Sequence, residues 1–231
     1  MKKVLTALCT LALVCSCTFS INGVSNGKRV VCKGPETSKS FDFTDFTGIT
    51  VNGSSDITIN QGETYSVNVK ANEEVFDYLD YEVIDGVLVL KNKDNVQIVA
   101  KTFKVYVTLP CLEKLLVNGA ADAEISNYKS DKDLSVMVNG AGDFEVASIQ
   151  VPPLTFTVNG AGDIDASDLD VETLTVSVNG AGDVDLSGKA HTANLSVSGA
   201  GDIDASELEM EHTNIRKSGF ASIETKKKDN K

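Results

Sequence analysis

The chain has 231 residues, of which 33 are acidic and 21 are lysine or arginine, and its formal net charge at pH 7 is −12. Such an excess of carboxylates repels a phosphate backbone, which excludes nucleic acid as a partner. The sequence has no tryptophan and only five tyrosines, and this weakens the case for a sugar site built on exposed aromatic platforms.

The first residues carry the features of a secretory signal. Lys2 and Lys3 form a basic segment, and residues 4–14 form an apolar one. The apolar segment is well short of the roughly 20 residues that span a bilayer as a helix. We therefore predict export and not a transmembrane anchor.

The sequence Val-Cys-Ser-Cys at residues 14–17 is similar to the lipobox of bacterial lipoproteins. It predicts a lipoprotein signal peptide over residues 1–16, lipidation of Cys17, and a membrane as the partner of the lipid anchor. Such a protein would be exported, anchored in the outer membrane, and would face the periplasm or the cell surface. The alternative is ordinary signal-peptidase cleavage near Ser16 or Ser20, which would release the protein.

Residues 17–40 are rich in Ser, Asn, Gly and Lys, and this composition predicts a flexible tether. From Phe41 onward, β-branched segments alternate apolar and polar residues, as half-buried strands do. Residues 81–90 contain two such runs around Asp85 and Gly86, which is a strong signal for a β-hairpin. Residues 41–110 therefore predict strands and hairpins that cap one end of the domain.

A Gly-rich motif, Asn-Gly-Ala-Gly-Asp in its clearest copies, then recurs at steps of 19 to 21 residues. The copies lie at residues 118–122, 139–143, 159–163, 179–183, 198–202 and 218–222, and an early copy lies at residues 52–56. A fixed period near 20 is typical of a solenoid in which each repeat forms one turn.

The segments between these corners predict about three short strands per repeat and show no helical periodicity. Leu134, Val136 and Val138, for example, alternate with polar residues on the way into a corner. Twenty residues at about 3.3 Å each can close one rung of three strands and tight turns. We predict an all-β fold, a single-stranded parallel β-helix with right-handed coils over residues 41–220, followed by a charged tail at residues 221–231.

Two other repeat classes fit less well. The LxxLxL frame of leucine-rich repeats is missing from the sequence. The calcium-binding repeat of haemolysin type resembles the corner motif but recurs about every nine residues.

Stacked rungs bring equivalent corner residues about 4.8 Å apart, so each corner position becomes a column. We predict that an asparagine column forms a hydrogen-bonded ladder, and that the glycines allow a tight bend or a close backbone approach. The predicted ladder residues are Asn118, Asn139, Asn159 and Asn179, with Gly140, Gly160 and Gly180 beside them. Phosphate binding by these glycines would need a helix N-terminus or a Lys-Ser/Thr pair, and the sequence has neither at the corner.

The aspartate that ends each corner has three interpretations. Stacked carboxylates repel one another by about 1 kcal/mol per neighbour in water, so turn N–H groups, open solvent or bound cations should relieve the repulsion. We favour turn capping and keep calcium as the alternative ligand. The candidate metal ligands are Asp143, Asp163, Asp183 and Asp202, and a second column is predicted at Asp165, Asp185 and Asp204.

Catalysis is the third interpretation, because paired carboxylates serve as acid and base in glycoside hydrolases. A catalytic site is a local exception within a repeat, whereas these aspartates are the repeat itself. The two histidines, His191 and His212, show neither a triad pattern nor zinc-site spacing. Cys32 and Cys111 could pair or stay as free thiols. We therefore predict a protein that is not an enzyme and needs no cofactor.

The order of these motifs resembles a known family. The segment LPCLEKLLVNGAADAEIS at residues 109–126, the earlier segments at residues 46–53 and 57–62, and the serial NGAGD corners are similar to the putative auto-transporter adhesin, head GIN domain family. The resemblance covers Phe41 to Phe220. It implies a single-stranded β-helix in secreted or lipid-anchored envelope proteins, many from Bacteroidetes, and it carries over no catalytic residues.

These features predict a noncatalytic cell-envelope lipoprotein with an adhesive, scaffolding or ligand-presenting role. Its glycan or protein ligand would contact a flat strand face and not a pocket. The alternative is a polysaccharide-binding or carbohydrate-active β-helix protein, assisted by calcium at the aspartate columns. A groove that holds non-repeated Asp, Lys or Tyr residues would favour the alternative, whereas a smooth regular face would favour the first interpretation.

Overall fold

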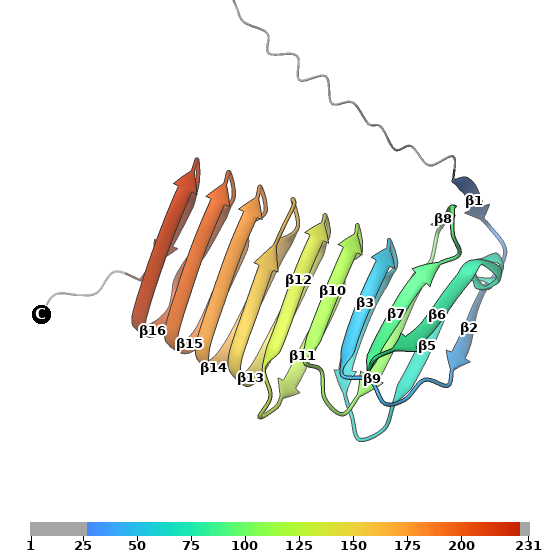
Figure 1. Ribbon diagram of the computed structural model, residues 1–231, viewed down its shortest axis with the longest axis horizontal. Coiled ribbons are helices and arrows are strands. Elements are labelled where there is room, and N and C mark those ends of the chain that lie inside the picture. The colour runs from blue at the N-terminus through green and yellow to red at the C-terminus, as the bar shows by residue number, and fades with distance from the viewer. Residues whose placement is uncertain (1–26, 227–231) are drawn as a thin grey trace, which may run out of the picture.

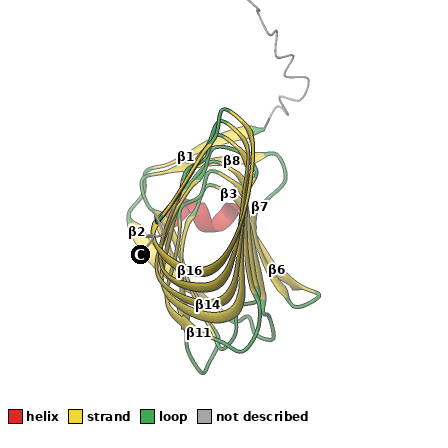
Figure 2. Cartoon of the chain, turned by 90° about the vertical axis from the view of Figure 1, so that its left-hand side faces the viewer, coloured by secondary structure: helices red, strands yellow, loops and turns green. Residues whose placement is uncertain are grey.

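The computed structural model describes residues 27–226 and shows a parallel β-solenoid of about six turns. The turns stack side by side along one axis (Figure 1), and a view along that axis shows them superposed as a flattened coil (Figure 2). The all-β parallel β-helix predicted from the repeat is thereby confirmed. Cys17 and the signal peptide predicted over residues 1–16 lie outside the described residues.

The N-terminal half of the described chain consists of short strands and one 3-10 helix. The elements are β1 (Lys28–Cys32), β2 (Glu36–Phe41), β3 (Gly48–Gly53), β4 (Asp56–Gln61), β5 (Ser66–Asn72), η1 (Glu73–Tyr78), β6 (Leu79–Ile84), β7 (Val87–Asn92), β8 (Val96–Ala100) and β9 (Phe103–Leu109). β6 and β7 pair antiparallel, and the turn between them holds Asp85 at φ 49° and Gly86 at φ 76°. Two successive positive φ angles are what a type I′ turn requires, so the predicted hairpin is confirmed.

The C-terminal half forms the regular coils. Its strands are β10 (Lys114–Gly119), β11 (Ala123–Lys129), β12 (Leu134–Gly140), β13 (Asp143–Val158), β14 (Asp163–Gly180), β15 (Val184–Gly199), β16 (Asp202–Gly219) and β17 (Ser222–Thr225). The three short strands expected per repeat run together into one long strand from β13 onward. Asn127, Ser148 and Asp168 adopt positive φ at equivalent places in successive turns, and they bend the chain at a second corner.

The early corner copy at residues 52–56 belongs to a turn that is inserted between others. β3 pairs in parallel with both β7 and β10, and β4 pairs in parallel with both β9 and β11. The β3–β4 turn therefore lies between the turn that contains β7 and β9 and the turn that contains β10 and β11. Asn52 stacks directly on Asn118 as a result.

The tether predicted over residues 17–40 is wrong from Lys28 onward. β1 pairs with β8, and β2 pairs with β5, so these residues form part of the N-terminal cap. The buried Cys32 and the half-buried Val30 supply the apolar contacts that the polar composition concealed. The tail predicted at residues 221–231 is likewise wrong in its first part, because β17 adds a short parallel strand to β16.

Inward-pointing residues at every second position form continuous apolar columns through the coils. Val138, Val158 and Val178 are completely buried at equivalent positions. In the last coil, three exposed residues stack on the buried residues of the coil before. They are Thr213 on Ala193, Ile215 on Leu195 and Lys217 on Val197. An inward-pointing lysine on an edge strand is a known device against edge-to-edge pairing, and it ends the hydrophobic core here.

Within residues 27–226, no helix has both the length and the apolar character needed to cross a bilayer. Cys32 and Cys111 are free thiols in the structure.

Candidate functional site

The asparagine column is a hydrogen-bonded ladder at one corner of the coils. The side-chain amide of each asparagine donates to the side-chain oxygen of the asparagine in the preceding turn. The donor–acceptor distances are 2.8 Å for Asn118 to Asn52, 2.9 Å for Asn139 to Asn118, 2.8 Å for Asn159 to Asn139, and 3.0 Å for Asn179 to Asn159. The side-chain amides of the ladder hydrogen-bond to one another, so the asparagines have a structural role.

The glycines beside the ladder allow the turns to stack closely. A Cβ atom on Gly140 would overlap the carbonyl oxygen of Gly119, and one on Gly160 would overlap that of Gly140. Gly180 has the same relation to Gly160. The amide that follows each of these glycines donates to the same carbonyl oxygens, for example Ala161 N to Gly140 O at 2.9 Å. The glycines are therefore required by packing between turns.

The aspartates that end the corners also bond from turn to turn. Asp122 Oδ1 accepts from the backbone N–H of Asp143 at 3.0 Å, and Asp163 Oδ1 accepts from that of Asp183 at 2.9 Å. Asp183 and Asp202 continue the pattern by accepting from Asp202 N at 3.0 Å and Ser222 N at 2.8 Å. Turn capping would use an N–H group of the carboxylate's own turn. In the structure the N–H group that bonds to the carboxylate belongs to the next turn.

A second acidic column lies two residues further along each strand. It consists of Glu124, Glu145, Asp165, Asp185, Asp204 and Glu224, which are in register with one another. Desolvation, together with the carboxylates of Asp204, Asp165, Asp183 and Asp163, raises the pKa of Asp185. Asp204 differs, because hydrogen bonds from Ser206 lower its pKa.

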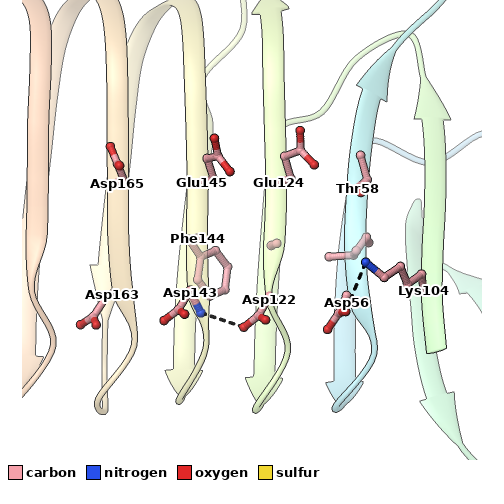
Figure 3. Close-up of a pocket in the computed structure, with 12 residues that line it drawn as sticks. Asp56, Thr58, Lys104, Asp122, Glu124, Asp143, Phe144, Glu145, Asp163 and Asp165 are labelled. Carbon is pink, nitrogen blue, oxygen red and sulfur yellow. Dashed lines mark hydrogen bonds and ion pairs between the residues drawn. The ribbon is translucent and has the colours of Figure 1, made fainter. Parts of the chain in front are cut away.

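Together the two columns form the acidic face, which we define as the outward-pointing side chains of β11, β17 and the first halves of β13 to β16. A hollow of about 530 Å3 lies at its N-terminal end, between β4, β11 and β13 (Figure 3). Asp122, Asp143 and Asp163 line one side of the hollow in a row, and Glu124, Glu145 and Asp165 form the row above them. A second hollow of about 260 Å3 follows along β14 to β16.

Among residues 27–226, Lys104 is the one cation that lines the first hollow. Its Nζ lies 4.0 Å from Asp56 Oδ2, across the strand pair β4 and β9. Burial raises the pKa of Asp56, and the Asp122 carboxylate raises it further, while Lys104 acts in the opposite direction. Asp56 ends the early corner copy at residues 52–56, whereas Lys104 lies outside the corner repeat. The parallel pairing of β4 with β9 is what brings them to the acidic column.

The opposite broad side of the coils has different chemistry. We define the neutral face as the outward-pointing side chains of β12 and of the second halves of β13 to β15. It consists of Ser135, Met137, Thr155, Thr157, Thr175, Ser177, Asn194 and Ser196, which are half-buried and uncharged. The asparagine ladder forms its border at the corner.

The two remaining cysteines lie in the N-terminal part. Burial, with a smaller effect of Glu74, raises the pKa of Cys32. Cys111 Sγ lies 3.6 Å from the hydroxyl of Tyr128, which also contacts the backbone of Leu112. A protonated, buried Cys32 is chemically inert.

These observations define a class of protein: a β-solenoid that presents long, repetitive side-chain columns at its surface. The chain belongs to the putative auto-transporter adhesin, head GIN domain family, which matches residues 45–230. The resemblance noted from the corner motifs is thereby confirmed, and the family description indicates an extracellular or envelope-associated protein.

Solved structures share the fold. A putative lipid binding protein from Parabacteroides distasonis is 20% identical, with a TM-score of 0.76 over 85% of this chain and 98% of that one. A putative adhesin from the same species is 20% identical, with a TM-score of 0.72 over 86% and 84% of the two chains. A putative adhesin from Bacteroides fragilis is 16% identical, with a TM-score of 0.67 over 84% and 98%. No curated protein matches the chain.

Proposed function

We propose that the protein is a noncatalytic lipoprotein of the cell envelope that binds a glycan or protein ligand through a broad strand face. The observation that carries this proposal is the use of the corner carboxylates. Asp122, Asp163 and Asp183 each accept a backbone N–H from the next turn. A carboxylate that bonds one turn of the scaffold to the next is poorly placed to exchange protons with a substrate.

The acidic face is the surface that we assign to the ligand. Its hollows lie along the columns, and a long ligand could contact several turns at once. Ionised carboxylates only accept hydrogen bonds, so the matching ligand must supply donors such as sugar hydroxyls or the ammonium and guanidinium groups of a protein. Desolvation and, after it, the neighbouring carboxylates raise the pKa of Asp185, and contact with a cationic group would reduce the repulsion among these carboxylates.

The position of the described N-terminus supports attachment through Cys17. The described chain starts just before β1, which pairs with β8, at the end of the solenoid remote from β16 (Figure 1). A lipid anchor on that side would leave the coils and both broad faces accessible. Replacement of Cys17 by Ala should move the protein from the membrane to the soluble fraction, and unchanged fractionation would remove the lipoprotein part of the proposal.

The binding part is tested by screening the purified protein against immobilised glycans and matrix proteins, with and without calcium chloride. Binding should fall in Asp165→Asn and Asp185→Asn by modest, cumulative steps, and it should persist in Thr155→Val and Thr175→Val on the neutral face. A ligand that responds only to the neutral-face variants would contradict the assignment of the acidic face.

One observation favours the polysaccharide-active alternative, namely the hollow that combines Asp56 and Lys104 with the repeated carboxylates. If that alternative holds, a single variant such as Asp56→Asn would abolish turnover of the bound polysaccharide. A multi-degree rise in melting temperature with calcium alone would show in addition that the columns hold a cation.

A further inference from the structure

The two histidines of the chain lie side by side on the surface of adjacent turns. His191 is on β15 and His212 is on β16, and their rings are 5.3 Å apart, edge to face. Glu211 completes the group, with its Oε2 3.0 Å from His191 Nδ1. One ligand atom from each of the three side chains lies within 4.8 Å of the others.

The repeat explains this juxtaposition. β15 and β16 pair in register as Ala190 with Met210 and Thr192 with His212, so position 191 stacks against position 211. His191 and Glu211 lie between these two pairs. The consecutive residues Glu211 and His212 both reach His191, since one ligand atom of each of the three side chains lies within 4.8 Å of the others.

The donor set has the composition of a transition-metal site. Two imidazoles and one carboxylate suit Zn2+, Cu2+ and Ni2+, whereas Ca2+ and Mg2+ prefer oxygen ligands alone. Zinc sites with three protein ligands leave a further position for water or an external ligand. Zinc bonds to nitrogen are about 2.0–2.1 Å long, so the ligand atoms must draw together slightly, and exposed side chains are free to do so.

The surroundings favour a cation. A hollow of about 570 Å3 beside the cluster is lined by Asp170, Glu172 and Glu209 as well as Glu211, with Lys189 as the opposing charge. Such a surplus of carboxylates raises the local concentration of divalent ions. The contact between His191 and Glu211 accounts for those two side chains, but an exposed pair contributes little and leaves the position of His212 unexplained.

We propose that His191, Glu211 and His212 form a surface site for a divalent transition metal ion, with zinc as the best-suited ion. The site is separate from the acidic columns and from the face that we assign to the ligand. Its three protein ligands leave an open coordination position, through which the bound ion could contact a donor group outside the protein.

The test is a zinc titration of the purified, tag-free protein by isothermal calorimetry, supported by the visible absorption of Co2+ in place of zinc. We expect saturation at one ion per chain. His191→Ala and His212→Ala should each weaken zinc binding by at least about tenfold and abolish the cobalt spectrum, because a missing ligand costs no less than the loss of its supporting contact. Glu211→Gln should weaken it less than either.

Two control variants separate the site from the rest of the surface. Glu207→Gln, on the same strand, and Asp185→Asn, in the acidic column, should leave the stoichiometry and the affinity unchanged. All five side chains are exposed, so the circular dichroism spectrum should stay the same in every variant. Zinc binding that survives the two histidine variants but falls in Asp185→Asn would overturn the proposal, as would the absence of saturable binding.

Discussion

The acidic face and the neutral face share one backbone and one core but carry opposite surface chemistry. On the neutral face, uncharged side chains, mostly Thr and Ser, stack on one another from turn to turn, and uncharged groups tolerate the short spacing between turns. On the acidic face, like charges stack at the same spacing, where each pair is unfavourable. A repeat that needed only stability would have used the neutral chemistry on both sides.

The two faces differ in how the side chains of successive turns interact. The asparagine ladder at the border of the neutral face satisfies itself by amide hydrogen bonds. The first acidic column is relieved by backbone N–H groups. In the second column, desolvation and the neighbouring carboxylates raise the pKa of Asp185, whereas hydrogen bonds from Ser206 lower that of Asp204. Uncompensated charge on a regular scaffold is consistent with selection for contact with a partner.

The largest effect should come from breaking the corner that joins the two faces. Gly160→Val places a side chain against the carbonyl of Gly140, and the turns must separate to accept it. We expect a loss of about 3 kcal/mol in the free energy of unfolding, at the upper end of the cost of overpacking, measured by urea denaturation. Ala161→Ser, on the exposed neighbour, is the control and should change stability by less than about 0.5 kcal/mol. Equal stabilities of the two variants would show that the turns are not stacked as described.

A smaller effect should follow from cutting the asparagine ladder. Asn159 donates one ladder bond and accepts another, whereas Asn179 donates one to Asn159 and has Ser198 above it. Asn159→Ala should therefore cost about 1–2 kcal/mol and Asn179→Ala about half of that, at roughly 1 kcal/mol per net hydrogen bond. Thermal unfolding of the two variants in parallel measures the ratio. If both substitutions lowered the free energy of unfolding by the same amount, the second ladder bond of Asn159 would contribute nothing to stability.

The sequence predicts the regular coils well because each corner repeats the same local requirement. The glycines, the asparagines and the alternating apolar residues all point to the same fold, and the step of about 20 residues fixes which positions stack. The same step could have placed His191 against Glu211, since they are 20 residues apart. That pair was missed because neither residue belongs to the motif.

The irregular end could not be predicted in the same way. Residues 28–40 have a polar composition, and their strands form only because β5 and β8, far along the chain, offer edges to pair with. The insertion of the β3–β4 turn between later turns likewise depends on long-range pairing, which local patterns do not encode. Asp56 and Lys104 come together through this topology, so the hollow on the acidic face was not visible in the sequence.

The smallest expected effect on the free energy of unfolding is a gain in stability. Asp185→Asn removes one charge from the second acidic column, and no described residue donates a hydrogen bond to the Asp185 carboxylate. We expect a gain of roughly 0.5 kcal/mol at pH 7 and low salt, since each neighbouring pair costs at most about 1 kcal/mol in water. The gain should shrink with added salt, because these carboxylates are exposed to solvent. Asp131→Asn, in the exposed turn before β12, is the matched control and should give no comparable gain.

The pH dependence of this gain follows from the direction of the pKa shift. The pKa of Asp185 is higher in the folded protein than in the unfolded chain, so ionisation of this group opposes folding. Below the ordinary aspartate pKa of about 3.9 the group is protonated in both states, and the variant should match the parent protein. As the pH rises from the unfolded pKa through the folded pKa, the parent should lose stability relative to the variant, and above the folded pKa the difference should stay constant. Thermal unfolding of both proteins at pH 3 and pH 7 tests this. A gain that is already complete at pH 3 would assign the effect to packing and remove the charge argument for the acidic face.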